Sequence, residues 1–191
     1  MQIDAARLAV AEHQYARAFR LLDLANGARF GSGSSLEVLL ELFGVQSRNF
    51  LDAAVICFNK NAEGAVFRSE HAIVGLREYL GEPRECSALR LAELLLKRAK
   101  SSLDSYGRLA FLHGNVMTPH VTHVRYLFVL QKVISSRMAN MDPVKLLTEA
   151  DEELDRVIYH LEVSSFLLHL NEAKRLKAGI EGSLAHYRRH E

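Results

Sequence analysis

One arginine and three histidines lie within residues 108–123, RLAFLHGNVMTPHVTH, a stretch interrupted by Gly-Asn and Thr-Pro pairs. Arg108 comes five positions before His113, and His120 and His123 follow the two pairs. A histidine side chain can take up or release a proton near neutral pH, and an arginine can hold a phosphate with two parallel hydrogen bonds. These residue types suit chemistry on a phosphodiester, so Arg108 and His113 are candidate catalytic residues.

The spacing of Arg108 and His113, Arg-x4-His, resembles the loose signature of HEPN ribonucleases, a family of small helical bundles. The resemblance implies a metal-independent ribonuclease that uses this arginine and this histidine on RNA. Leu109 departs from the signature, in which a polar residue commonly follows the arginine. On a regular helix the two residues would point about 140° apart, and only Arg125 adds positive charge nearby. The sequence therefore favours a turn between two helices and a protein that is not an enzyme, with the ribonuclease as an alternative.

The histidines of this stretch are also possible metal ligands across the turn at 114–119. His120 and His123 are three residues apart and would share one helix face. No carboxylate occurs between Asp104 and Asp142, however, and the Glu-x-x-His motif of di-iron bundles does not occur in the chain. We therefore predict no metal and no other cofactor.

The acidic segment that contains Glu149, Glu153 and His160 would suit acid–base chemistry. At helical spacing these three residues share a face with Lys145 and Arg156, and a pair is expected between Lys145 and Glu149. A face of alternating charge is typical of a solvated helix surface. We therefore expect no active site there.

His169 lies among leucines in SSFLLHL, which predicts a buried histidine that is hydrogen-bonded to a neighbouring group. Aromatic side chains at Tyr126 and Phe128 are expected in the same core. A small ligand bound inside the bundle near these three residues is therefore a second alternative function.

Apolar residues recur at helical spacing through almost the whole chain, and strand-like alternation is nearly absent. We predict an all-α protein, a single-domain antiparallel bundle of six or seven helices that spans residues 1–191. Gly44 is expected to end the second helix, and Gly81 to cap the fourth. The expected helices cover 4–28, 34–43, 47–59, a segment that ends at 79, 88–113, 118–139 and 143–190.

The segment 143–190 carries two apolar stripes on different faces. One straight helix of this length would measure about 70 Å at a rise of 1.5 Å per residue, which is too long for one compact domain. We expect a bend or break near Ser164-Ser165 or Gly179–Gly182, with 171–191 as a possible helical extension. The second stripe is expected to be an interaction surface that comprises Phe166, Leu170, Leu176, Ile180 and Leu184.

Composition limits the partners and the location. The 191 residues carry a formal net charge of +1, so no overall positive field attracts DNA or an anionic membrane. The apolar runs are shorter than the ~20 residues of a membrane span, and the N-terminus is not typical of a signal peptide. Cys57 and Cys86 make no disulfide framework. We expect a soluble, cytoplasmic protein without DNA or membrane partners.

These observations favour a helical protein–protein interaction module, namely a scaffold, an adaptor or a regulatory subunit, whose partner is another protein or a second copy of the chain. An apolar surface beyond what one fold can bury usually indicates a partner. RNA is a partner only under the ribonuclease alternative. Truncation after Leu170 is expected to leave a folded protein that loses self-association or partner binding.

Overall fold

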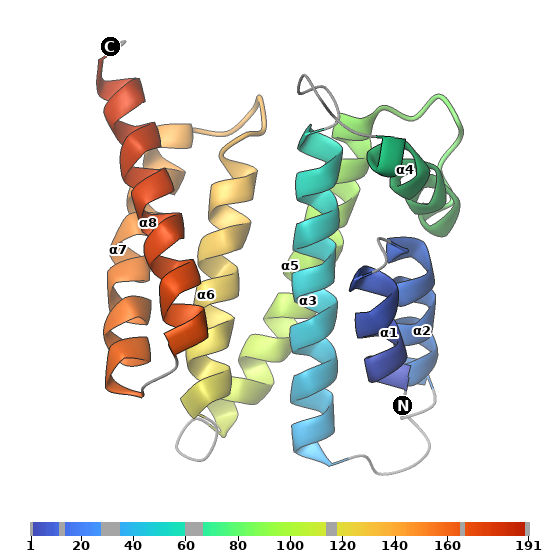
Figure 1. Ribbon diagram of the computed structural model, residues 1–191, viewed down its shortest axis with the longest axis horizontal. Helices are drawn as coiled ribbons and strands as arrows, with labels where there is room; N and C mark the ends of the chain where they lie inside the picture. The colour runs from blue at the N-terminus through green and yellow to red at the C-terminus, as the bar shows by residue number, and fades with distance from the viewer. Residues whose placement is uncertain are drawn as a thin grey trace. The chain divides into compact units, whose positions relative to one another are not determined.

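The computed structural model describes residues 2–11, 14–27, 35–59, 67–113, 118–164 and 167–189, which form eight α-helices and no strand (Figure 1). The predicted all-α class is confirmed, whereas the predicted count of six or seven helices is not. The chain divides into two compact units, Met1–Leu109 and Ala110–Glu191, with the boundary inside one long helix. The single domain over 1–191 and the antiparallel bundle as a whole stay predictions.

The first unit is built around close packing of small and aromatic side chains. Its helices are α1 (Gln2–Ala11), α2 (Tyr15–Gly27), α3 (Leu36–Asn59), α4 (Phe67–Leu80) and most of α5 (Ala88–Leu112). Buried alanines such as Ala6 and Ala18 lie where α1 and α2 meet, because a methyl side chain lets two helices approach closely. The Phe19 ring stacks on Phe50 of α3 at a centroid distance of 4.4 Å.

Two of the expected helix boundaries in this unit are wrong. The expected helix 4–28 is two helices, since α1 ends at Ala11 and α2 begins at Tyr15. Gly44 does not end a helix but lies inside the continuous helix α3. The expected cap at Gly81 is present, because this residue follows α4 with a φ of 71°, a conformation that favours glycine.

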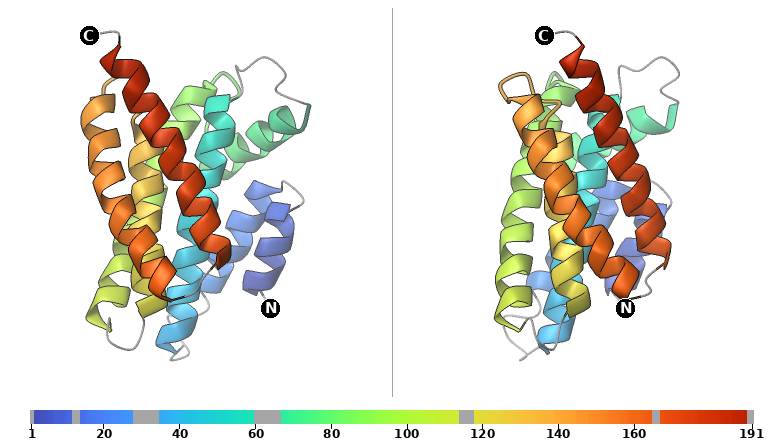
Figure 2. Two further views of the ribbon diagram at one scale, coloured as in Figure 1. Left: turned by 60° about the vertical axis from the view of Figure 1, so that its left-hand side comes forward. Right: turned by 90° about the vertical axis from the view of Figure 1, so that its left-hand side faces the viewer.

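The second unit contains the end of α5 and three further helices, α6 (Thr118–Ser135), α7 (Pro143–Val163) and α8 (Leu167–Arg188). Helix α7 packs against both α6 and α8, and α7 and α8 lie side by side in both views of Figure 2. Asp142 caps α7, because its carboxylate accepts a hydrogen bond from the Lys145 amide at 3.0 Å. Helix α6 stops at Ser135, four residues before the expected end at 139.

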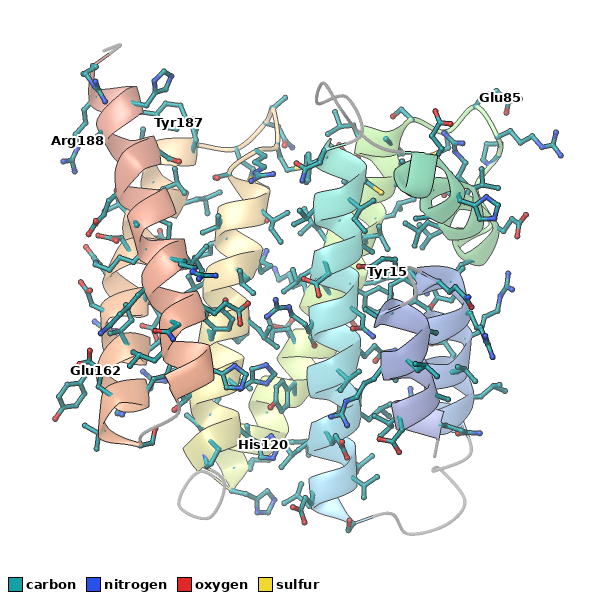
Figure 3. All side chains as sticks on the ribbon, viewed as in Figure 1. Tyr15, Glu85, His120, Glu162, Tyr187 and Arg188 are labelled. Atoms are coloured by element: carbon teal, nitrogen blue, oxygen red, sulfur yellow. The ribbon has the colours of Figure 1, made fainter. Side chains whose placement is uncertain are left out.

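The long C-terminal segment breaks at Ser164, as one of the two expected positions predicted, and Gly179 and Gly182 lie inside α8. The starts of α6 and α8 and the end of α7 therefore meet at one end of the unit. Figure 3 shows His120 and Glu162 near this end and Tyr187 at the opposite end.

The proposed interaction stripe on α8 is largely covered within the chain. Leu170, Ile180 and Leu184 are buried with 8%, 1% and 6% of their surface exposed. Leu176 is half-buried, and Phe166 lies outside the described residues. The described part of this stripe therefore contributes to the core rather than to an open apolar surface.

Candidate functional site

The candidate catalytic pair lies at the C-terminal end of α5. Arg108 and His113 are both exposed, and His113 occupies the turn that directly follows the helix. The regular helix from Ala88 to Leu112 directs positions five residues apart to different sides. Neither Arg108 nor His113 is among the described residues that line a cavity of either unit.

The structure groups the histidines differently from the sequence. His123 of α6 lies beside His169 of α8, with ring centroids 6.3 Å apart. Both rings and His160 of α7 line one cavity, whereas His120 and His113 do not. Among the residues that the structure describes, no three His, Cys, Asp or Glu side chains are arranged to hold a metal ion.

The cavity lies at the end of the second unit, where α7 ends and α6 and α8 begin. It has a volume of about 260 Å³. Pro119 from the first turn of α6 and Leu161 and Val163 from the last turn of α7 form apolar parts of its wall. Leu161 is 6% exposed and belongs to the core, so the base of the wall is fixed by packing.

Six of the nine described lining residues carry a polar group, and they come from all three helices. Thr122 and Tyr126 of α6 are only 7% and 5% exposed, and Ser164 lines the cavity at the end of α7. Apolar atoms nevertheless form most of the wall surface, and mainly apolar walls with hydrogen-bonding groups are typical of small-molecule sites.

The break between α7 and α8 creates this arrangement. The Ser164 amide donates to the His160 carbonyl at 3.1 Å, and the Ser164 hydroxyl donates to the same carbonyl at 2.6 Å. The amide bond is the ordinary α-helical bond between residues four apart, and the hydroxyl adds a second donor to the same oxygen at the end of the helix. Because the chain turns immediately afterwards, α8 returns along α7 and brings His169 to the cavity.

The electrostatics of the cavity come from imidazoles rather than from permanent charges. No Asp, Glu, Lys or Arg is among the described residues that line it. The nearest acidic residue in sequence, Glu162, forms an ion pair with Lys174 of α8 at 2.8 Å. The cavity can therefore accept an apolar body and offer hydrogen bonds to a polar group at the histidines.

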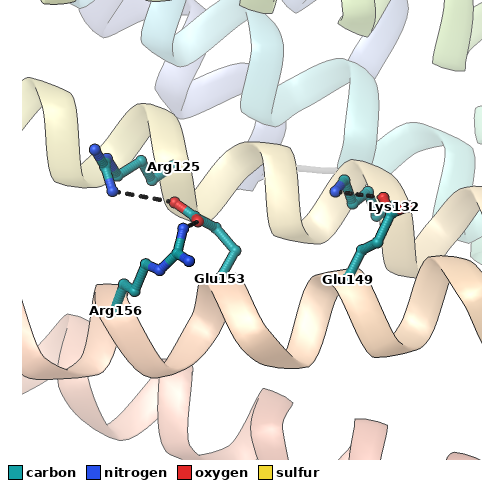
Figure 4. A network of polar contacts seen from close by, with 5 residues as sticks. All are labelled: Arg125, Lys132, Glu149, Glu153 and Arg156. Atoms are coloured by element: carbon teal, nitrogen blue, oxygen red, sulfur yellow. Dashed lines mark hydrogen bonds and ion pairs between the residues drawn. The ribbon is translucent and has the colours of Figure 1, made fainter.

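The acidic face of α7 forms contacts other than the expected pair between Lys145 and Glu149. Glu149 accepts a hydrogen bond from Lys132 of α6 at 2.8 Å, and this bond lowers the pKa of the Glu149 carboxyl below its usual value. Glu153 lies between Arg125 of α6 and Arg156, at 3.3 and 3.0 Å (Figure 4). The Lys132–Glu149 and Arg125–Glu153 pairs join α6 to α7, whereas the Arg156–Glu153 pair lies within α7.

Two of the three residues that the sequence places around a bound small ligand line the cavity. Tyr126 and His169 line it, whereas Phe128 lines a separate polar cleft beside the ion pairs of α6 and α7. His169 is exposed rather than buried. The charge pattern places His160 on a solvated face, whereas a break at Ser164 brings residues 160 and 169 to the same end of two antiparallel helices.

Comparison of the chain with protein-family models, with curated proteins and with solved structures finds no match. Of the helices in the described ranges, none combines the length and apolar character needed to cross a membrane. The geometry of the cavity is therefore the main guide to function.

Proposed function

We propose that this protein binds a small, mainly apolar molecule in the cavity between α6, α7 and α8. The cavity itself carries the proposal, because it combines a buried wall at Leu161 with polar groups from three helices. Its volume of about 260 Å³ is close to the lower end of the range of about 300–1,000 Å³ that is typical of ligand pockets. The ligand is accordingly smaller than most drug-like molecules.

The packing around the cavity supports binding without a large rearrangement. Thr122, Tyr126 and Leu161 are buried and are held by α6 and α7, which pack against each other along their length. A site whose walls are already ordered costs less conformational entropy to occupy. The mouth carries the exposed residues Val163 and Ser164, which leaves a route of entry.

Titration with 1-octanol, followed by ¹H–¹⁵N NMR spectra of the full chain, tests the proposal. We expect saturable shifts of amides in residues 119–126 and 160–170, with a dissociation constant on the order of 0.1–1 mM for so small a ligand. Shifts that do not saturate, or that are spread evenly over all eight helices, would contradict a site at this cavity.

A tryptophan at the cavity provides a matched test. Ser164→Trp places a large side chain at the mouth and should abolish the shifts. Ser183→Trp is the control, because Ser183 is also exposed and also donates its hydroxyl to a carbonyl four residues earlier, but lies far along α8. Equal loss of binding in both variants would show that the effect is not specific to the cavity.

A self-associating interaction module is the second candidate, and a different surface from the expected stripe favours it. Tyr159 and Val163 lie one turn apart on α7 with 64% and 70% of their surface exposed. Adjacent exposed apolar side chains are common at contacts between copies of a chain. Native mass spectrometry should then show a dimer that Tyr159→Ser weakens and Tyr187→Ser does not, and a monomer at all concentrations would reject this candidate.

A further inference from the structure

The chemistry of the cavity lining restricts the polar group that a ligand can carry. His123, His160 and His169 each come from a different helix and line the same cavity. An imidazole donates at least one N–H hydrogen bond in either protonation state, and it donates two when protonated. The Thr122 hydroxyl can also donate, whereas the Ser164 hydroxyl already donates to the His160 carbonyl.

The lining has no permanent negative charge to bind a cation. None of its described members is Asp or Glu, and the neighbouring Glu162 is already paired with Lys174. A buried ammonium group without a carboxylate partner would lose its hydration with little compensation. A group that accepts several hydrogen bonds suits this site better than a group that donates them.

The partial charges of the three helix ends beside the cavity, taken together, also favour a ligand group that accepts hydrogen bonds. Helices α6 and α8 begin beside the cavity, and their N-termini carry partial positive charge. The C-terminus of α7 carries an opposing partial negative charge, which Ser164 reduces by donating its amide to the Glu162 carbonyl and its hydroxyl to the Leu161 carbonyl. Two helix N-termini therefore add to the donors of the three imidazoles.

We propose that the cavity binds a small monocarboxylate, with the apolar body against Leu161 and Val163 and the carboxylate hydrogen-bonded by the imidazoles. This inference rests on the proposed function and specifies the ligand class for the same site. The carboxylate meets hydrogen-bond donors rather than a lysine or arginine, so binding is moderate and exchange is rapid. An apolar tail with an anionic head satisfies both the wall and the histidines.

Three probes with the same tail and different heads test the head-group preference. Octanoate, 1-octanol and octylammonium are titrated into the full chain at one pH and one ionic strength, with affinity measured by the shifts of amides 119–126 and 160–170. We expect octanoate to bind about tenfold more tightly than octanol, as hydrogen bonds to a charged acceptor are stronger. Octylammonium should bind most weakly.

Substitution of the two exposed histidines of the cavity separates the contribution of the ligand's head group to affinity from that of its alkyl tail. His160→Gln and His169→Gln should each weaken binding of octanoate more than binding of octanol, so that most of the tenfold advantage of octanoate is lost. His186→Gln is the control, because His186 is an exposed histidine at the other end of α8. It should leave both affinities unchanged.

The outcomes distinguish failure of the ligand class from failure of the site. Equal binding of octanol and octanoate, both abolished by Ser164→Trp, would overturn the carboxylate preference and retain the apolar site. Tightest binding of octylammonium would also overturn it. If none of the three probes binds, both the ligand class and the proposed function are wrong.

Discussion

A Cβ atom added to Gly44 would lie 3.2 Å from Cε1 and Cζ of the Tyr106 ring, so the glycine is required by close packing of α3 against α5. Tyr106 is 1% exposed, which leaves its ring little room to move. Ser102, one turn earlier on α5, donates its hydroxyl to Gln46 Oε1 at 3.1 Å and fixes the same contact. The glycine therefore serves the approach of two helices rather than the end of one.

Gly44→Ala should destabilise the protein by about 1–2 kcal/mol, because the added methyl group overpacks a filled contact. Where there is free space around a glycine in a helix interior, the same change to alanine normally stabilises the protein by about 0.5–1 kcal/mol. Gly182 of α8 has no atom within 4 Å of its added Cβ, so Gly182→Ala is the control with the opposite expected sign. Urea unfolding measures both, and stabilisation of the Gly44 variant would contradict the packing role.

Lys177 of α8 links this helix to α7 through ion pairs with two carboxylates of α7. Its Nζ lies 2.7 Å from Asp155 and 3.0 Å from Asp151. Burial lowers the pKa of Lys177, but the hydrogen bonds to Asp155 and Asp151 outweigh this effect and raise the pKa above its usual value.

Lys177→Met should therefore cost about 1–2 kcal/mol in the free energy of unfolding, since it leaves the partly buried carboxylate of Asp151 without its cation. Lys174→Met is the control. The Lys174–Glu162 pair is about half exposed on both sides, and such pairs contribute only about 0–1 kcal/mol. The same loss in both variants would show that the cluster at Lys177 has no special weight.

Stability should fall at alkaline pH because of a buried tyrosine. Burial raises the pKa of Tyr106 above its usual value near 10. The folded state therefore favours the protonated phenol, and its contribution to stability is complete below pH ~10 and is lost as the pH rises above the pKa of the unfolded chain.

Tyr106→Phe should make the stability loss between pH 9 and pH 11 smaller than in the unaltered protein. Tyr159→Phe removes a tyrosine that is 64% exposed and should leave the pH dependence unchanged. Denaturant midpoints at several pH values measure the slope, and identical slopes for the Tyr106 variant and the unaltered protein would refute this account.

Truncation after Leu170 should unfold the second unit, in contrast to the expectation from sequence. The truncation removes Ala173, Ile180 and Leu184, which are buried, together with Lys177. Each buried Leu or Ile contributes about 1.5–3 kcal/mol. NMR dispersion of the amides of α6 and α7 reports the loss, and truncation after Arg188 is the control. A truncated chain with unchanged α6 and α7 spectra would show that α8 is dispensable.

Local signals in the sequence predicted the elements whose boundaries depend on local chemistry. Asp142-Pro143 starts α7, Gly81 caps α4, and the change of apolar face marks the break at Ser164. Each of these features arises from a backbone conformation or a hydrogen bond within a few residues. Periodicity alone was enough for the all-α class.

Tertiary contacts decided the elements that the sequence did not predict. A glycine inside a helical pattern suggests that the helix ends there. The true reason for Gly44, its close contact with the ring of Tyr106, is not visible in the sequence. The separation of α1 from α2 has no Gly or Pro signal between Ala11 and Tyr15. His123, His160 and His169 meet only because three helix ends meet, and their spacing of 37 and 9 residues carries no motif.

Intermolecular NOEs report whether a small apolar ligand occupies the cavity between α6, α7 and α8. With 1-octanol bound, we expect NOEs from the alkyl chain to the methyl groups of Leu161 and Val163 and to the ring of Tyr126. The Ser164→Trp variant should show none of them. NOEs from octanol only to residues outside this cavity, or no NOE at saturating octanol, would show that the cavity is not a binding site.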